Sequence, residues 1–239
     1  MIRHALLLVF VLGAATAQGG LVFESKPTRT HLLELFTSEG CSSCLPAEGW
    51  LSNLKNEPRL WQDFVPIAFH VDYWDHLGWR DPFASKLWTE RQADYSARWK
   101  IETVYTPAFV LDGLAWRNAA IPPAATETPG VLKIAINGEH VTAVFEPATS
   151  AGRPYEIHVA RLGFALGADV TAGENHGRKL VHDFVVLGLT NERMKSGMKE
   201  LRLPAELPKQ GADSRGAIAA WVTPAGQIEP IQAVGGWLQ

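Results

Sequence analysis

The chain has 239 residues, of which 46% are hydrophobic and 20% are charged. This composition can bury one large core or two modest ones, and it excludes extended disorder. The formal net charge is −3 and the sequence has no stripe of lysine and arginine, which excludes nucleic acid as an expected partner. The sequence has no phosphate-binding glycine loop of recognised spacing, and no cofactor is predicted.

The first 17 residues have the pattern of a secretory signal peptide. A short basic start with Arg3 precedes an apolar run from Ala5 to Ala15, and the small residues end at Ala17. The run is shorter than the roughly 20 residues that cross a bilayer, so we predict cleavage after Ala17. Cleavage removes Arg3 and leaves 21 of the 22 basic residues against 25 acidic ones, a net charge of −4. The mature chain is therefore expected to be periplasmic or secreted, without a membrane span.

The cysteine pair Cys41 and Cys44 is the strongest chemical signal. A disulfide between residues this close removes little entropy from the unfolded chain, so stability alone is a weak reason for the pair. The apolar run 30–37 predicts a strand that ends before Cys41, and the helical spacing after Pro46 predicts a helix as far as Asn56. The pair would then lie at a helix N-terminus, where backbone N–H groups and the helix dipole favour Cys41 as a thiolate.

Further elements follow in chain order. The sequence predicts a strand at 64–71, a helix with Asp81 as its N-cap, a strand at 104–111 and a hairpin turn at Asp112-Gly113. This order predicts a mixed sheet flanked by helices. Pro107 interrupts the last strand near its start, and a cis peptide bond there can turn the strand edge toward the cysteines.

The second half of the chain has short strands and little helical periodicity. A segment rich in proline and small residues at 121–130 is expected to be the domain boundary. Beyond it, strand-like runs and turn signals predict a β-sandwich-like domain. These runs are Leu132 to Phe145 around Asn137-Gly138, Tyr155 to Phe164, Leu180 to Leu187, Ala217 to Val222 and Ile228 to Val234. The predicted division is a signal peptide at 1–17, an α/β domain at 28–123 and a mostly β domain at 130–239.

The order of strand, CxxC, second strand, helix and Thr-Pro strand resembles the thioredoxin superfamily. Four segments resemble more narrowly a family of secreted bacterial proteins known only by a domain of unknown function on a thioredoxin-like core. These segments are Leu33 to Cys44, His70 to Trp79, Tyr105 to Pro107 and Gly173 to Gly177. The resemblance implies an α/β thioredoxin-like fold for the first domain.

By analogy with thioredoxins, Cys41 would be the nucleophile, Cys44 the resolving thiol and Pro107 the cis-proline. One departure concerns the buried acid that thioredoxins place six residues before the nucleophile. Leu35 occupies that position here, and the neighbouring Glu34 is expected to face the opposite side of the strand.

The leading prediction is a thiol–disulfide oxidoreductase that acts on protein or small-molecule thiols and disulfides. Thr106, Trp74 and Trp79 are candidate substrate contacts, although the two tryptophans would equally cover the core beneath a long loop. One alternative is a non-enzymatic cell-envelope binding module with an inert disulfide. Another is a copper or zinc site that uses Cys41, Cys44 and His70.

In the second half, four polar residues invite a metal or acid–base interpretation. Turn polarity and cross-strand pairing explain them about equally well, so no chemistry is assigned to them. They are Glu174, His176, His182 and Asp183.

Overall fold

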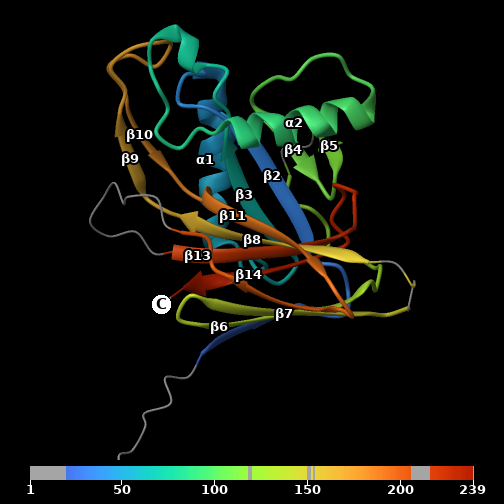
Figure 1. The fold of residues 1–239 in the computed structure, drawn as a ribbon. Helices are drawn as coiled ribbons and strands as arrows, with labels where there is room; N and C mark the ends of the chain where they lie inside the picture. The colour runs from blue at the N-terminus through green and yellow to red at the C-terminus, as the bar shows by residue number, and fades with distance from the viewer. Residues whose placement is uncertain (1–19, 118–119, 150–151, 153, 206–215, 239) are drawn as a thin grey trace, which may run out of the picture.

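The structure, a computed structural model, describes residues 20–117, 120–149, 152, 154–205 and 216–238 (Figure 1). The predicted signal peptide at 1–17 lies outside these residues. The described residues form fourteen strands, two α-helices and three short 3₁₀ helices. None of the helices in this part of the chain combines the length and the apolar character that a membrane crossing needs.

The elements have the following bounds. The strands are β1 (Leu21–Glu24), β2 (His31–Thr37), β3 (Phe64–His70), β4 (Ala108–Leu111), β5 (Leu114–Trp116), β6 (Gly130–Asn137), β7 (His140–Pro147), β8 (Tyr155–Gly163), β9 (Leu166–Asp169), β10 (Lys179–His182), β11 (Val185–Met194), β12 (Met198–Arg202), β13 (Gly216–Pro224) and β14 (Gln232–Leu238). The helices are η1 (Ser42–Cys44), α1 (Leu45–Asn53), η2 (Leu54–Asn56), η3 (Asp75–Leu77) and α2 (Lys86–Trp99).

Most strands belong to one mixed sheet of eight, in the order β14-β13-β8-β11-β3-β2-β4-β5. Within it β3 pairs in parallel with both β2 and β11, and the remaining neighbours are antiparallel. A second, antiparallel sheet has the order β1-β6-β7-β12, and β9 and β10 form a separate hairpin. The second sheet packs on β8 and β13 through a core that includes Ile134, Phe145, Ile157 and Ala220.

Burial on both faces explains why β2 and β3 are almost continuously apolar. Pro66 is tolerated within β3 because β11 pairs with β3 only at Ala68. Ala68 donates its N–H to the carbonyl of Phe184, whereas the recorded β3–β11 pairing is confined to Val185 with Ala68. Pro66 lies two residues earlier on the same side, where no ladder donor is needed.

Two predicted hairpin turns are confirmed. Asp112 and Gly113 join β4 to β5 with φ angles of 50° and 86°, the left-handed region that a two-residue hairpin turn requires. Gly138, with a φ of 61°, joins β6 to β7.

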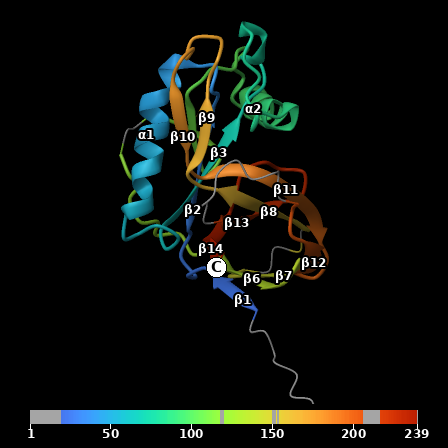
Figure 2. The ribbon, with the colours of Figure 1, turned by 90° about the vertical axis from the view of Figure 1, so that its left-hand side faces the viewer.

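The predicted fold class is wrong. The structure is mostly β, and its two α-helices accompany only the part of the large sheet that contains β2 and β3, as Figure 2 shows. The expected α/β thioredoxin-like domain and separate sandwich differ from what is observed, because β11 pairs with β3 and continues one sheet into β8, β13 and β14. The division at 123–130 stays a prediction.

Two local predictions also need correction. The run Leu180 to Leu187 is not one strand: it divides between β10 and β11 around Phe184, whose φ is 59°. Asp81 does not cap a helix, since α2 begins at Lys86 with Ser85 as its N-cap. The Asp81 side chain instead contacts His70 at the end of β3.

Candidate functional site

The two cysteines form a disulfide at the junction between a strand and a helix. β2 ends at Thr37, Cys41 is the N-cap of η1, and Cys44 is the N-cap of α1. The sulfur–sulfur distance is 2.11 Å, and both cysteines are 0% exposed. The hydroxyl of Ser43 lies 3.4 Å from the Cys41 sulfur. The strand–cysteine–helix order predicted from the sequence is therefore confirmed.

A loop from the second half of the chain contacts the segment that carries the disulfide. Glu174 Oε2 accepts hydrogen bonds from the backbone N–H of Ser42 at 2.9 Å and from its hydroxyl at 2.8 Å. Asn175 donates from Nδ2 to the carbonyl of Glu39 at 2.8 Å. Glu174 was assigned no chemistry from the sequence, because nothing local signals a partner 132 residues away.

An open pocket of about 750 Å³ lies beside Ser43, the residue that precedes Cys44. Ser43 and Pro107 both line it, so the structure brings Pro107 to the cysteine segment, and the Thr106–Pro107 peptide bond is cis. Trp50, Phe109 and Trp116 form aromatic walls, with Trp50 and Phe109 in edge contact at 5.2 Å between centroids.

Trp74 contacts both the Thr106–Pro107 segment and the turn before Cys41. Its Nε1 donates to Thr106 Oγ1 at 2.8 Å. Its Cβ lies so close to Gly40 that a Cβ added at residue 40 would be 2.8 Å away, so the turn before Cys41 requires glycine. Trp74 thus packs between the cysteine turn and the Thr106–Pro107 segment.

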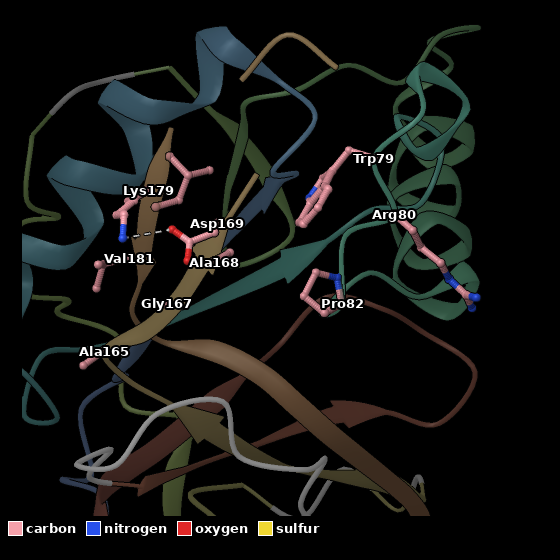
Figure 3. Close-up of a pocket in the computed structure, with 10 residues that line it drawn as sticks. Trp79, Arg80, Pro82, Ala165, Gly167, Ala168, Asp169, Lys179 and Val181 are labelled. Atoms are coloured by element: carbon pink, nitrogen blue, oxygen red, sulfur yellow. Dashed lines mark ion pairs between the residues drawn. The ribbon is translucent and has the colours of Figure 1, made fainter. Parts of the chain in front are cut away.

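Trp79 lies in a different pocket, of about 720 Å³, which Figure 3 shows between the segment of Trp79, Arg80 and Pro82 and the β9–β10 hairpin. An ion pair of 3.4 Å between Lys179 and Asp169 lies on the hairpin side. The indole Nε1 of Trp79 donates to Glu39 Oε2 at 2.6 Å, which connects the pocket wall to a buried group of acids and histidines.

That group, the buried acid–histidine cluster, consists of Glu39, Glu48, His70, Asp81 and His182. His182 Nε2 lies 3.0 Å from Glu39 Oε1, and His182 Nδ1 lies 2.9 Å from Glu48 Oε2. His70 Nδ1 lies 2.7 Å from Asp81 Oδ2, and the two imidazole rings are 5.0 Å apart between centroids. Thr37 donates its hydroxyl to Glu48 Oε1.

Segments far apart in the chain supply this cluster. His70 ends β3, and the alternation of β10 turns His182 inward while Val181 faces the pocket of Figure 3. Glu48 lies in the first turn of α1, one turn after Cys44. The exposed fractions of the residues His70 and His182 are 1% and 2%.

The charges in the cluster shift the pKa values of its members. Burial alone lowers the pKa of His182, but the hydrogen bonds and charges of Glu39 and Glu48 raise it to about 10. Burial raises the pKa of Glu48, and the stronger combined effect of His182, His70 and Thr37 brings it below its ordinary value. The pKa of Asp81 is also lowered, since burial is outweighed by the charge and hydrogen bond of His70.

Most of this cluster was missed from the sequence. Asp81 was interpreted as an N-cap, His182 was assigned no chemistry, and Glu39 and Glu48 were not singled out. The only local signal is that Glu39 and Glu48 flank the cysteines, two residues before Cys41 and four after Cys44.

Glu34 belongs to a separate site on the α2 side of the sheet. Its Oε2 lies 2.6 Å from Nε of Arg91, and its other oxygen accepts from the hydroxyl of Tyr95. Glu34 is 0% exposed and takes no part in the contacts of the cysteine segment described above.

Comparison with known proteins gives a family and a fold. The family described as "Protein of unknown function (DUF1223)" matches residues 32–223. A crystal structure of a protein from Agrobacterium tumefaciens has 23% identity and a TM-score of 0.62, over 90% of this chain and 96% of that one. HBP35 of Porphyromonas gingivalis has 15% identity and a TM-score of 0.59, over 90% of this chain and 76% of that one. No curated protein matches the sequence. At these identities the likeness extends to the fold alone.

Proposed function

The chain belongs to DUF1223, a family of unknown function, and we propose from its own site that it is an exported thiol–disulfide oxidoreductase centred on Cys41 and Cys44. The observation that carries the proposal is the disulfide at the start of α1, beside the pocket lined by Ser43 and Pro107. Its substrates are protein or small-molecule thiols and disulfides.

Each half-reaction exchanges two electrons between the protein and one substrate, and a second thiol or disulfide substrate restores the starting form of the cysteines. In the dithiol form, the Cys41 thiolate attacks one sulfur of a substrate disulfide, a mixed disulfide forms, and the other substrate sulfur leaves as a thiolate. The Cys44 thiolate then attacks the Cys41 sulfur, which forms the Cys41–Cys44 bond and releases the second substrate thiolate. The protein loses two electrons and the substrate gains two, and the reverse sequence oxidises a substrate dithiol.

The helix N-terminus supports Cys41 as the attacking thiolate. Backbone N–H groups at the start of a helix have no partner within the helix and favour a negative charge. A thiolate is the nucleophile in exchange.

The aromatic pocket supports a substrate with an apolar side chain. Trp50, Phe109 and Trp116 offer rigid apolar surface next to Ser43. Because both sulfurs are buried, we expect the Ser42–Glu174 contact to open before a substrate reaches Cys41.

Activity assays on point variants test this function. The purified protein should reduce or oxidise a model disulfide, Cys41→Ser should abolish turnover, and Cys44→Ser should accumulate a mixed disulfide with the substrate. Ser52→Ala, near the far end of α1, serves as the control and should retain activity. Equal behaviour of the wild type and Cys41→Ser across redox buffers would contradict the proposal and support a non-enzymatic binding module with an inert disulfide.

Export is tested separately. The signal-peptide pattern of residues 1–17 supports it, as does a disulfide, which persists in oxidising compartments. In a cell that secretes the chain, the mature protein should begin at Gln18 and be found outside the cytoplasm. An intact Met1 terminus in the cytoplasmic fraction would contradict export.

A further inference from the structure

Three carboxylates and two imidazoles meet in the buried acid–histidine cluster, and one imidazole nitrogen there has no partner. His70 is 1% exposed, and its Nε2 is buried without a hydrogen bond. A buried polar atom left unpaired costs about 1–3 kcal/mol, so such an atom calls for an explanation.

Two further side chains with donor atoms, Glu48 and His182, lie near His70. One atom each from Glu48, His70 and His182 lie within 4.8 Å of one another. Glu48 Oε2 and His182 Nδ1 are 2.9 Å apart as a hydrogen-bonded pair, and a small separation would bring them to the spacing of about 3.3–3.6 Å between tetrahedral ligands of an ion bound at about 2.0–2.2 Å. A modest closing movement of His70 would complete the set.

Each of the two histidines has a carboxylate at one ring nitrogen, as histidines that bind metal ions usually have. A ligating histidine donates its other ring N–H to a carboxylate, which fixes the tautomer and the ring orientation. Here Asp81 lies 2.7 Å from His70 Nδ1, and Glu39 lies 3.0 Å from His182 Nε2. These bonds leave His70 Nε2 unpaired, and an ion would replace the proton in the contact between His182 Nδ1 and Glu48 Oε2.

The charge of the cluster favours a cation. Within the described residues, none of the carboxylates of Glu39, Glu48 and Asp81 has an ion pair with lysine or arginine. Their recorded partners are histidines, neutral donors and backbone N–H groups. A divalent ion bound there would add positive charge beside three carboxylates.

We propose that Glu48, His70 and His182 form a buried site for a divalent first-row transition metal ion of the zinc class. Two imidazoles and one carboxylate are the ligand types that such ions prefer, and the site uses no cysteine. It goes beyond thiol–disulfide exchange and differs from the thiolate site considered from the sequence, which shares only His70 with it.

Titration of the purified full chain with its disulfide intact, after dialysis against a chelator, tests this site. Co²⁺ added to the chain should give visible d–d absorption that saturates at one ion per chain, and Zn²⁺ should abolish it by displacement. Zn²⁺ should also raise the melting temperature, because a ligand that binds only the folded state stabilises it.

Variants then locate the ion. His70→Gln should remove the absorption and the Zn²⁺-dependent rise in melting temperature. Asp81→Asn should weaken the affinity for Co²⁺ by about 10- to 100-fold, because Asp81 orients His70 without binding the ion itself. His158→Gln removes a buried histidine elsewhere and should bind as the wild type does. Near-UV circular dichroism checks that each variant is folded.

A double variant separates this site from the cysteines. Cys41→Ser/Cys44→Ser should retain full Co²⁺ affinity although it cannot carry out exchange. The inference is overturned if the oxidised wild type binds neither ion, if His70→Gln or the folded Asp81→Asn variant binds as tightly as the wild type, or if only the double cysteine variant loses binding.

Discussion

Glu174 accepts two hydrogen bonds from Ser42, the first residue between the two cysteines, at 2.9 Å from the backbone nitrogen and 2.8 Å from the hydroxyl oxygen. These donated bonds lower the pKa of the Glu174 carboxyl, so it is ionised at neutral pH. A loop far along the chain therefore holds the segment whose sulfurs are buried.

The contact predicts that Glu174 limits access to the disulfide. Glu174→Ala removes both acceptors, and we expect reduction of the disulfide by dithiothreitol to become about three- to tenfold faster. Global stability should change little, since Glu174 lies at the surface. The rate of thiol appearance measures the effect.

Glu192→Ala is the matched control, because it removes a surface glutamate whose ion pair with Lys199 is distant in the sequence from the cysteines. It should leave the rate unchanged. An unchanged rate in Glu174→Ala as well would show that opening of this loop does not limit reduction.

The aromatic pocket predicts discrimination between large and small substrates. Trp50→Ala removes one wall beside Ser43, so the KM for a peptide disulfide with an apolar side chain should rise about tenfold while the rate with dithiothreitol stays the same. Leu114→Ala, at a leucine that is 67% exposed, is the control. Equal losses with both substrates would place the effect on the thiols rather than on docking.

Local signals predicted much of the chain near the cysteines. The apolar runs of β2 and β3, the helix after Cys44 and the turns at Asp112-Gly113 and Asn137-Gly138 all depend on residues close in sequence. Such patterns determine individual elements because hydrophobic periodicity and turn conformations act over a few residues.

Strand order and the buried cluster could not be predicted in this way. The parallel pairing of Val185 with Ala68 joins residues 117 positions apart. It places strands from both predicted domains in one sheet. Asp81 before a proline has the local pattern of an N-cap, but the tertiary contact with His70 prevails. Short-range patterns carry no information on which distant segment supplies the partner.

The Glu34–Arg91 pair predicts a large stability effect on the α2 side of the sheet. Glu34 Oε2 and Arg91 Nε lie 2.6 Å apart, and the side chains of Glu34 and Arg91 are 0% and 10% exposed. Glu34→Gln leaves the guanidinium buried without a counter-charge, which should reduce the free energy of unfolding by about 3–5 kcal/mol in urea. Lys86→Ala breaks an exposed pair with Glu90 and should cost less than about 0.5 kcal/mol. Similar small losses in both variants would contradict the prediction.

His158 predicts a loss of stability in acid. It is buried, stacked on Trp221 with centroids 5.1 Å apart, and hydrogen-bonded to Thr223 at 3.2 Å. Burial, together with the charge of Arg91, lowers the pKa of His158 to about 3. In the unfolded chain a histidine binds a proton near pH 6.5, so below that pH the unfolded state binds more protons than the folded state. The stability due to neutral His158 is thus complete above about pH 6.5 and is lost as the pH falls toward 3, by about 1.4 kcal/mol per pH unit.

Urea unfolding of the wild type and His158→Gln between about pH 7 and pH 4.5 measures this contribution as a difference in slope. Other titrating groups affect both proteins alike, so the free energy of unfolding should fall less steeply in the variant by about 1.4 kcal/mol for each pH unit below 6.5. His140→Gln, at an exposed histidine, should keep the wild-type slope. Parallel curves for the wild type and His158→Gln would mean that the folded protein protonates His158 as readily as the unfolded chain does.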